Sequence, residues 1–225
     1  MRAFLAVLGW ALGSAAVLAE TRTTFRNFIP DASAFMRSYG TAAAPHGFVD
    51  FCRRHAEHCR PHGTPGRMPL TAERLDQLEA VNRWVNEVIS PTKDRDVYGI
   101  DEFWVLPVDK GDCEDYALLK RKLLIAQGWP TGALLLTVVR DEHGEGHAVL
   151  TARTNLGDVI LDNKIAELRF WQETHYDFVS RQSYVDPQHW VSLEAGSGQP
   201  PSQLAGVEGA SDDSGIDMTS PWLPH

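Results

Sequence analysis

The chain has 225 residues and carries 30 acidic against 21 basic side chains, which gives a formal net charge of −9. This balance argues against a nucleic-acid partner, because proteins that bind nucleic acid present an excess of basic side chains. Hydrophobic residues make up 43% of the chain, which at this length is enough for one domain with a substantial core.

The N-terminus has the features of an export signal. Arg2 is followed by an apolar stretch over residues 3–18, and the small residue Ala19 offers a cleavage site. This stretch is shorter than the roughly twenty residues that a membrane-spanning helix needs. We therefore expect residues 1–19 to be a signal peptide that is removed on export, with an uncleaved anchor as the alternative.

Three cysteines are an odd number for an exported protein. Cys52 and Cys59 are close in sequence, so we expect them to form a disulfide and to leave Cys113 as a free thiol. A continuous helix would hold the pair about 10.5 Å apart, so the disulfide requires a turn or a helix end between them. The alternative is a metal site, because four histidines surround the pair: His46, His55, His58 and His62.

Two helices are predicted from apolar spacing and from their end signals. The first spans residues 71–90, with Thr71 as its cap and Pro91 at its end. Its buried stripe is expected to contain Leu75, Leu78, Val81, Val85 and Val88, widened by Trp84 and Ile89. The second helix runs from its expected cap, Asp112, to about Gln127, where a glycine and a proline end it.

Strands are predicted at 133–140, 147–154 and 158–162, joined by glycine-containing turns. Residues 163–193 are rich in aromatic side chains and complete the domain as irregular structure or further strands. We therefore expect an α+β fold, with an N-terminal segment at 20–45 and a domain at 46–193. We expect residues 194–225 to form a disordered tail, because glycine, serine, proline and acids dominate there.

Cys113 is the candidate nucleophile. It stands where an extended segment turns into a helix, and the unpaired amides and dipole of a helix start favour a thiolate. A hairpin turning near residue 155 brings His147 and Asp162 close together across the ladder. A base and an orienting acid would complete a Cys-His-Asp triad for acyl chemistry. His143 is a rival base in a glycine-flanked loop, and a structural role for all three triad residues is the alternative.

The acids around Cys113 oppose its activation, because negative charge raises the pKa of a thiol. A calcium ion bound by Asp112, Glu114 or Asp115 would relieve that repulsion, since calcium prefers oxygen ligands. We therefore hypothesise a calcium site next to the nucleophile. The alternative is that these acids complement the helix dipole without a metal. Four of the five acids in residues 91–111 are either solvated charges or further cation ligands: Asp94, Asp96, Asp101 and Glu102.

Three sequence blocks resemble one known family, the bacterial transglutaminase-like cysteine proteinases, whose best-known members are the periplasmic LapG-type proteases. The blocks are Gly-Asp-Cys-Glu-Asp-Tyr-Ala at 111–117 with Lys120, Gly-His-Ala-Val-Leu at 146–150, and Gly-Asp at 157–158 followed by Leu-Asp-Asn at 161–163. The similarity spans roughly residues 46–192.

The resemblance implies a papain/transglutaminase-like core, in which a central helix carries the cysteine and packs on an antiparallel sheet carrying the histidine and aspartate. It implies that Cys113 is the nucleophile, His147 the base and Asp162 the orienting acid, with a calcium site that includes Asp112 and Glu114. LapG-type enzymes act in the periplasm, where they cut large surface adhesins near paired alanines and so release biofilm cells. They are sequestered by an inner-membrane cyclic-di-GMP receptor.

The residues leave two other functions open. The same triad serves an acyl transferase or transglutaminase, in which an amine replaces water as the acceptor. A non-catalytic module that keeps the fold and docks on a receptor is the third possibility. Reaction products separate the first two functions, because hydrolysis yields a cut and acyl transfer yields a crosslink.

Overall fold

The computed structural model describes residue 25 and residues 29–196. A seven-stranded sheet forms its centre, and its pairs of neighbouring strands are antiparallel. Across the sheet the order is β1 (Thr41–Ala42), β9 (Trp190–Ser192), β8 (Asp177–Gln182), β4 (Leu134–Arg140), β5 (Gly146–Arg153), β6 (Asp158–Leu161) and β7 (Arg169–Phe170).

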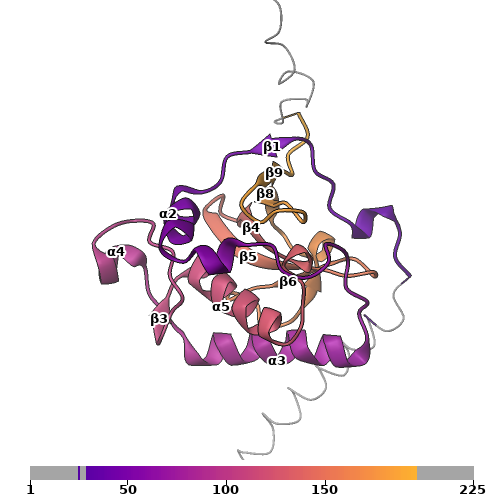
Figure 1. The fold of residues 1–225 in the computed structure, drawn as a ribbon, viewed down its shortest axis with the longest axis horizontal. Coiled ribbons are helices and arrows are strands. Elements are labelled where there is room, and N and C mark those ends of the chain that lie inside the picture. The colour runs from indigo at the N-terminus through magenta and orange to yellow at the C-terminus, as the bar shows by residue number, and fades with distance from the viewer. Residues whose placement is uncertain (1–24, 26–28, 197–225) are drawn as a thin grey trace, which may run out of the picture.

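The two longest helices, α3 (Ala72–Val88) and α5 (Cys113–Ala126), cover one face of this sheet. The described α-helices also include α2 (His46–Arg54) and α4 (Asp94–Tyr98), and the short 3-10 turns are η1 (Ala32–Ala34), η2 (Ala56–Cys59), η3 (Thr131–Ala133) and η4 (Trp171–Glu173). Helix α5 packs directly on β4 and β5, and α3 packs against α5 (Figure 1). The expected α+β architecture, with a central helix on an antiparallel sheet, is confirmed.

The sheet has two buried faces, because successive side chains of a strand point to opposite sides. The helix face carries Leu136 and Leu150, which join the main core with α3 and α5. The far face carries Val139, Val149 and Ile160, which pack with Met36 and Tyr176 in a second, smaller cluster. Burial on both faces accounts for the nearly continuous apolar run of β4, whose first four residues are all buried.

The predicted helices form with nearly the expected ends. Thr71 caps α3 by accepting a hydrogen bond from the Arg74 amide at 3.2 Å, and α5 ends before Gly128, which has a φ of +88°. The prediction of the α3 stripe was wrong at Trp84 and Val88, whose exposed fractions are 50% and 41%. These two positions lie at the margin of the stripe, where spacing alone does not separate buried from exposed residues.

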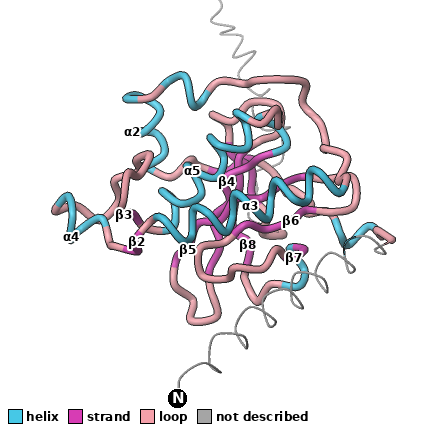
Figure 2. The backbone as a smooth tube through the Cα atoms, turned by 90° about the horizontal axis from the view of Figure 1, so that it is seen from below, coloured by secondary structure: helices cyan, strands magenta, loops and turns pink. Residues whose placement is uncertain are grey.

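A second, two-stranded sheet joins the end of α3 to the start of α5. Strand β2 (Ser90–Pro91) pairs in parallel with β3 (Lys110–Gly111), and α4 lies on the stretch of chain between them. Figure 2 shows β2, β3 and α4 together at one side of the domain. The Tyr116 hydroxyl of α5 also donates a hydrogen bond to the Ile89 carbonyl. The start of α5 is therefore tied to the end of α3.

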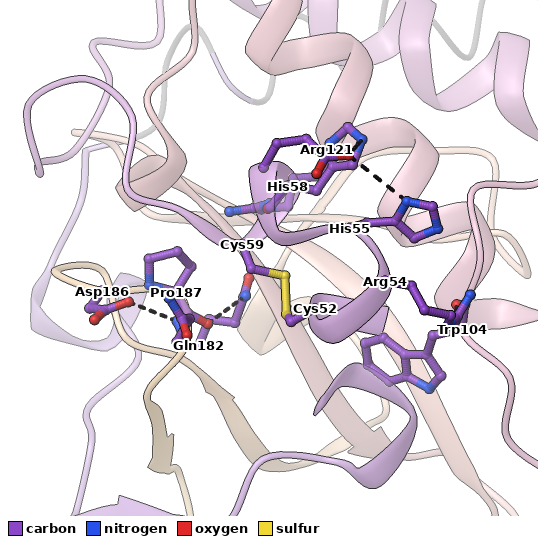
Figure 3. Close-up of a disulfide and its surroundings, with 12 residues drawn as sticks. Cys52, Arg54, His55, His58, Cys59, Trp104, Arg121, Gln182, Asp186 and Pro187 are labelled. Carbon is purple, nitrogen blue, oxygen red and sulfur yellow. Dashed lines mark hydrogen bonds and ion pairs between the residues drawn. A yellow bond between two sulfur atoms is a disulfide. The ribbon is translucent and has the colours of Figure 1, made fainter. Parts of the chain in front are cut away.

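The structure contains the disulfide between Cys52 and Cys59, with the two Cα atoms 5.7 Å apart. The required break lies between them, because α2 ends at Arg54 and the chain turns into η2. Figure 3 shows the disulfide beside the η2 turn, where the His58 carbonyl accepts a hydrogen bond from the Arg121 guanidinium at 2.9 Å. Because Arg121 belongs to α5, the disulfide-closed turn is connected to the central helix.

Part of the 20–45 segment joins the domain, since β1 forms the sheet edge beside β9. The expected signal peptide at 1–19 and most of the expected tail lie outside the described residues. Among residues 25 and 29–196, no helix combines the length and hydrophobicity needed to span a membrane. The assigned domain limits remain predictions.

Replacing both Cys52 and Cys59 with serine should lower the free energy of unfolding. Opening the loop between residues separated by seven positions costs about 2 to 3 kcal/mol through the greater freedom of the unfolded chain. Urea unfolding followed by circular dichroism measures this loss. The wild type under reducing conditions is the control and should match the double variant. Equal stability of the oxidised wild type and the double variant would contradict the expectation.

Candidate active site and acidic cluster

Cys113 is the first residue of α5 and follows β3 after one intervening residue. Asp112 has extended backbone at the N-cap position, but its side chain makes no capping hydrogen bond, contrary to the expectation. The chain approaches itself closely here: a Cβ on Gly111 would lie 2.7 Å from the Asp115 carboxylate. A residue with a side chain does not fit at position 111, because the Asp115 side chain occupies the space that its Cβ would need.

The thiol lies next to the strand that carries the predicted base. The Ala148 amide, adjacent to His147, donates to the Cys113 Sγ at 3.4 Å. His147 and Asp162 form a buried pair, with 2.9 Å between the histidine Nε2 and the aspartate Oδ1. Because Nε2 is engaged by Asp162, Nδ1 is the ring nitrogen that remains for the thiol. The structure thus brings His147 into contact with Asp162 and places the Cys113 sulfur against the backbone of the residue next to His147.

The β5–β6 register explains how His147 reaches Asp162. Leu150 pairs with Leu161, so continuing the ladder by one residue sets Asp162 opposite Val149. His147 is two residues from Val149 and points to the same face, which makes the pair diagonal neighbours. His143 lies in the loop between β4 and β5, where its side chain is 75% exposed and nearest to Glu142. It is separate from this group.

Tyr176 completes the group and was missed by the sequence analysis. Its hydroxyl donates to the second oxygen of Asp162 at 2.6 Å, and its ring packs edge-on against the His147 ring, with centroids 5.6 Å apart. The Lys164 amide also donates to Asp162, at 3.0 Å. Burial opposes ionisation of Asp162, but its bonds from His147 and Tyr176 outweigh burial and hold its pKa below the ordinary value. Asp162 is therefore ionised at neutral pH and is held in place by three hydrogen-bond partners.

An acidic cluster lies beside the thiol. Ligand oxygens of Asp94, Asp112 and Glu114 all lie within 4.8 Å of one another. The Cys113 thiol donates to the Glu114 carboxylate at 3.3 Å. Asp94 comes from α4, eighteen residues before Asp112, and its second oxygen accepts a hydrogen bond from the Phe103 amide. The acidic cluster is thus assembled from two separate segments of the chain.

The acidic cluster disfavours negative charge. Burial, followed by Asp112, raises the pKa of Glu114 to about 9. Burial also raises the pKa of Asp94. The Cys113 thiol is affected in the same direction, because burial and then the Glu114 charge raise its pKa well above the ordinary value. Without a compensating positive charge, the thiol therefore stays protonated at neutral pH.

The residues fit a divalent cation. One oxygen each of Asp94 and Asp112 is buried and has no hydrogen-bond partner, and oxygens from three carboxylates converge. Such a set of hard oxygen ligands suits calcium. Asp115 differs from the expectation, since it lies outside this three-residue group and its Oδ1 accepts from the Val105 amide at 2.7 Å. Within the described part of the chain, no other set of acids, histidines and cysteines meets the same criterion, and the Cys52–Cys59 region forms a disulfide instead.

Replacing Tyr176 with phenylalanine should destabilise the protein, because it leaves a buried carboxylate oxygen of Asp162 without its donor. The expected loss in the free energy of unfolding is about 1 to 3 kcal/mol. The pKa of Asp162 should rise at the same time, which carboxyl-carbon NMR measures. Because the folded-state pKa is depressed, its stabilising contribution is present at neutral pH and is lost as the pH falls through that value. The exposed Tyr39→Phe change should leave both quantities unaltered, and an unchanged Asp162 pKa in the Tyr176 variant would refute the role.

Comparison with known proteins identifies the family. Residues 38–197 match the model of the bacterial transglutaminase-like cysteine proteinases. Among solved structures, Legionella pneumophila LapG is 28% identical with a TM-score of 0.42, covering 48% of this chain and 62% of that one, and its EGTA-treated form gives the same values. These matches span less than two thirds of the LapG chain.

A calcium-bound form of Legionella pneumophila LapG is 25% identical with a TM-score of 0.46, covering 56% of this chain and 72% of that one. A comparison with curated protein sequences returns no match. The family model covers well over half of the chain. The matched region contains Cys113, His147, Asp162 and the acidic cluster. The chain belongs to the bacterial transglutaminase-like cysteine proteinase family.

Proposed function

We propose that this protein is an exported, calcium-dependent cysteine endopeptidase that acts in the periplasm. The observation that carries the proposal is the convergence of the Cys113 thiol, the His147–Asp162 pair and the acidic cluster on the start of α5. Family membership supports the peptidase class. The proposed substrate is a surface adhesin or another exported protein, and the proposed biological outcome is biofilm release. An inner-membrane cyclic-di-GMP receptor is the proposed regulator.

In the proposed reaction, His147 accepts the thiol proton and the Cys113 sulfur attacks the peptide carbonyl carbon. The oxyanion that forms is stabilised by the backbone amide at the helix start, where amides lack intrahelical partners. His147 then protonates the leaving amine, which breaks the C–N bond and leaves a thioester. A water molecule gives its proton to His147 and attacks the thioester, releasing the carboxylic acid and the free thiol. Asp162 holds the imidazole in place throughout.

Asp94, Asp112 and Glu114 would hold the calcium ion. A bound divalent cation would supply positive charge that offsets the carboxylates and lowers the pKa of the adjacent thiol. The need for such a charge follows from the direction of the Cys113 and Glu114 pKa shifts. In this proposal the ion orders and neutralises the nucleophile segment and does not contact the scissile bond.

Calcium should increase the reactivity of Cys113 toward iodoacetamide at pH 7. The positive charge of the bound ion would offset the carboxylate of Glu114 and so favour the thiolate form of Cys113. The alkylation rate as a function of pH gives the thiol pKa with calcium and with a chelator. We expect a pKa lower by at least one unit with calcium, which corresponds to about tenfold more thiolate. The His147→Ala variant should lose most of the activation. Identical pH profiles with calcium and chelator would contradict the proposal.

Peptidase activity is tested on a purified exported adhesin fragment that contains paired alanines, with calcium present. Mass spectrometry of the products should show two peptides whose masses sum to the substrate plus one water. The Cys113→Ala variant should give no cleavage, whereas the His143→Ala variant should cleave at the wild-type rate. A crosslinked product with loss of ammonia would instead establish acyl transfer. Absence of any product from a thiol shown to be activated would limit the substrate assignment but leave the nucleophile intact.

Asp94 should be needed for calcium binding, although it lies outside the nucleophile motif. Asp94→Asn should weaken calcium affinity at least tenfold in isothermal titration calorimetry, because it removes one of three charged ligands. Asp96→Asn is the matched control on the same short helix, since Asp96 is exposed while Asp94 is buried. Equal affinities of the two variants would exclude Asp94 as a ligand.

Calcium should stabilise the folded protein more strongly as the pH rises from 5 to 9. The pKa of Glu114 is raised, so protons compete with the metal for this carboxylate at the lower pH values.

A further inference from the structure

Three arginines gather on the far face of the sheet, at the end away from His147. Arg181 of β8 is paired across the ladder with Thr137, and the hydroxyls of Thr137 and Thr151 are 2.7 Å apart. Arg153 follows Thr151 by two residues and therefore points to the same face. Arg67 reaches this face from the segment before α3 and contacts Asp158 of β6.

The arginines share one buried carboxylate. Asp158, directly opposite Arg153 in the β5–β6 ladder, is fully buried. Its two oxygens accept hydrogen bonds from the Arg67 guanidinium at 2.7 and 3.4 Å, and one of them also accepts from the Met36 amide at 2.8 Å. Among the described residues, no carboxylate forms an ion pair with Arg153 or Arg181. Asp158 is hydrogen-bonded to Arg67 and its charge also attracts Arg153 and Arg181, so one carboxylate faces three guanidinium groups.

The guanidinium groups of Arg153 and Arg181 are buried with donors unmet. Arg181 is 4% exposed, and its Nε and Nη1 have no hydrogen-bond partner. Arg153 is 8% exposed, donates one bond to the Gly132 carbonyl at 3.0 Å, and its Nε has no partner. Burial and then the charges of Arg67 and Arg181 lower the pKa of Arg153 to about 10. A buried cation without acceptors is strongly unfavourable, so this region needs negative charge.

Partly exposed side chains border the cluster. The Arg67 side chain is 24% exposed, and the Tyr184 ring, 45% exposed, lies 4.3 Å from the Arg153 guanidinium carbon. Arg153 and His147 are six residues apart on one strand, which corresponds to roughly 20 Å. Arg67 and Tyr184 therefore bring the rim of the arginine cluster to the surface, while Arg153 and Arg181 lie beneath that rim, and the cluster is separate from the proposed active site.

We propose that Arg153 and Arg181, with Arg67 at the rim, form a binding site for a small oxyanion. Guanidinium groups present forked donors that match two oxygens of one phosphate, sulfate or carboxylate group. An oxyanion with several acceptor oxygens offers separate acceptors to the donors of both buried arginines, whereas a single-atom anion offers only one acceptor atom. The bound anion stabilises the fold by neutralising excess positive charge between β5, β6 and β8.

Thermal unfolding in calcium-free buffer at pH 7 tests the proposal. Inorganic phosphate is varied up to low millimolar concentration, and sodium chloride keeps the ionic strength constant. The melting temperature should rise with saturation, by about 5 to 10 °C at a concentration one hundredfold above the dissociation constant. Arg181→Met should abolish the rise. Arg140→Met is the matched control on neighbouring β4, where the arginine is exposed and paired with Glu194, and it should retain the rise.

Sulfate and acetate in parallel titrations distinguish a tetrahedral from a carboxylate ligand, and either one saturating in an Arg181-dependent way supports the site. Equilibrium dialysis with radiolabelled phosphate should give one anion per wild-type chain. Arg153→Lys, which keeps the charge but loses the fork, should weaken binding at least tenfold and serves if Arg181→Met does not fold. Equal shifts in wild type and Arg181→Met, an equal effect of chloride, or no phosphate bound in dialysis would overturn the proposal.

Discussion

The convergence of three carboxyl groups at the start of α5 is the constraint on which the site depends. A helix start favours a thiolate through its amides and dipole, yet Glu114 accepts a hydrogen bond from the same thiol and burial raises both pKa values. The buried, unpartnered oxygens of Asp94 and Asp112 add to the imbalance. In the proposed enzyme, a calcium ion reverses the sign of this local field, which makes the nucleophile responsive to the metal concentration of its compartment.

The sheet supplies the opposite kind of environment to the base. His147 and Asp162 are nearly inaccessible and are held by Tyr176 and the Lys164 amide, and the residues that hold them are not part of the acidic cluster. The proposed catalytic group therefore has two parts. The His147–Asp162 pair is held by paired strands, whereas the ionisation of the Cys113 thiol depends on the charge of the neighbouring acidic cluster. The far face of the sheet carries buried Asp162 at the end near His147. At the opposite end it carries the buried arginines Arg153 and Arg181.

Much of the architecture could be predicted from the sequence. The central helix is bounded by Asp112 and Gly128, and the two strands that follow carry their own turn residues, so the meeting of His147 with Asp162 followed from hairpin geometry. The disulfide followed from the odd cysteine count, whereas the helix end that it requires was located only in the structure. Asp94 and Tyr176 were harder to assign, because each reaches the site through tertiary pairing and neither belongs to a local pattern. The exposed Trp84 shows the same limit, since helical spacing defines the centre of a buried stripe better than its edges.

The two-residue ladder between β2 and β3 changes the thermodynamics of ion capture. Because Ser90 and Lys110 are paired, the stretch that carries Asp94 is a closed loop of about eighteen residues whether or not an ion is present. Closing a loop of that length costs about 2.5 kcal/mol in chain entropy, and folding of the core meets this cost in advance. An ion that had to close the loop itself would bind about 70-fold more weakly. The two-stranded sheet thus preorganises the segment that brings Asp94 to the acidic cluster.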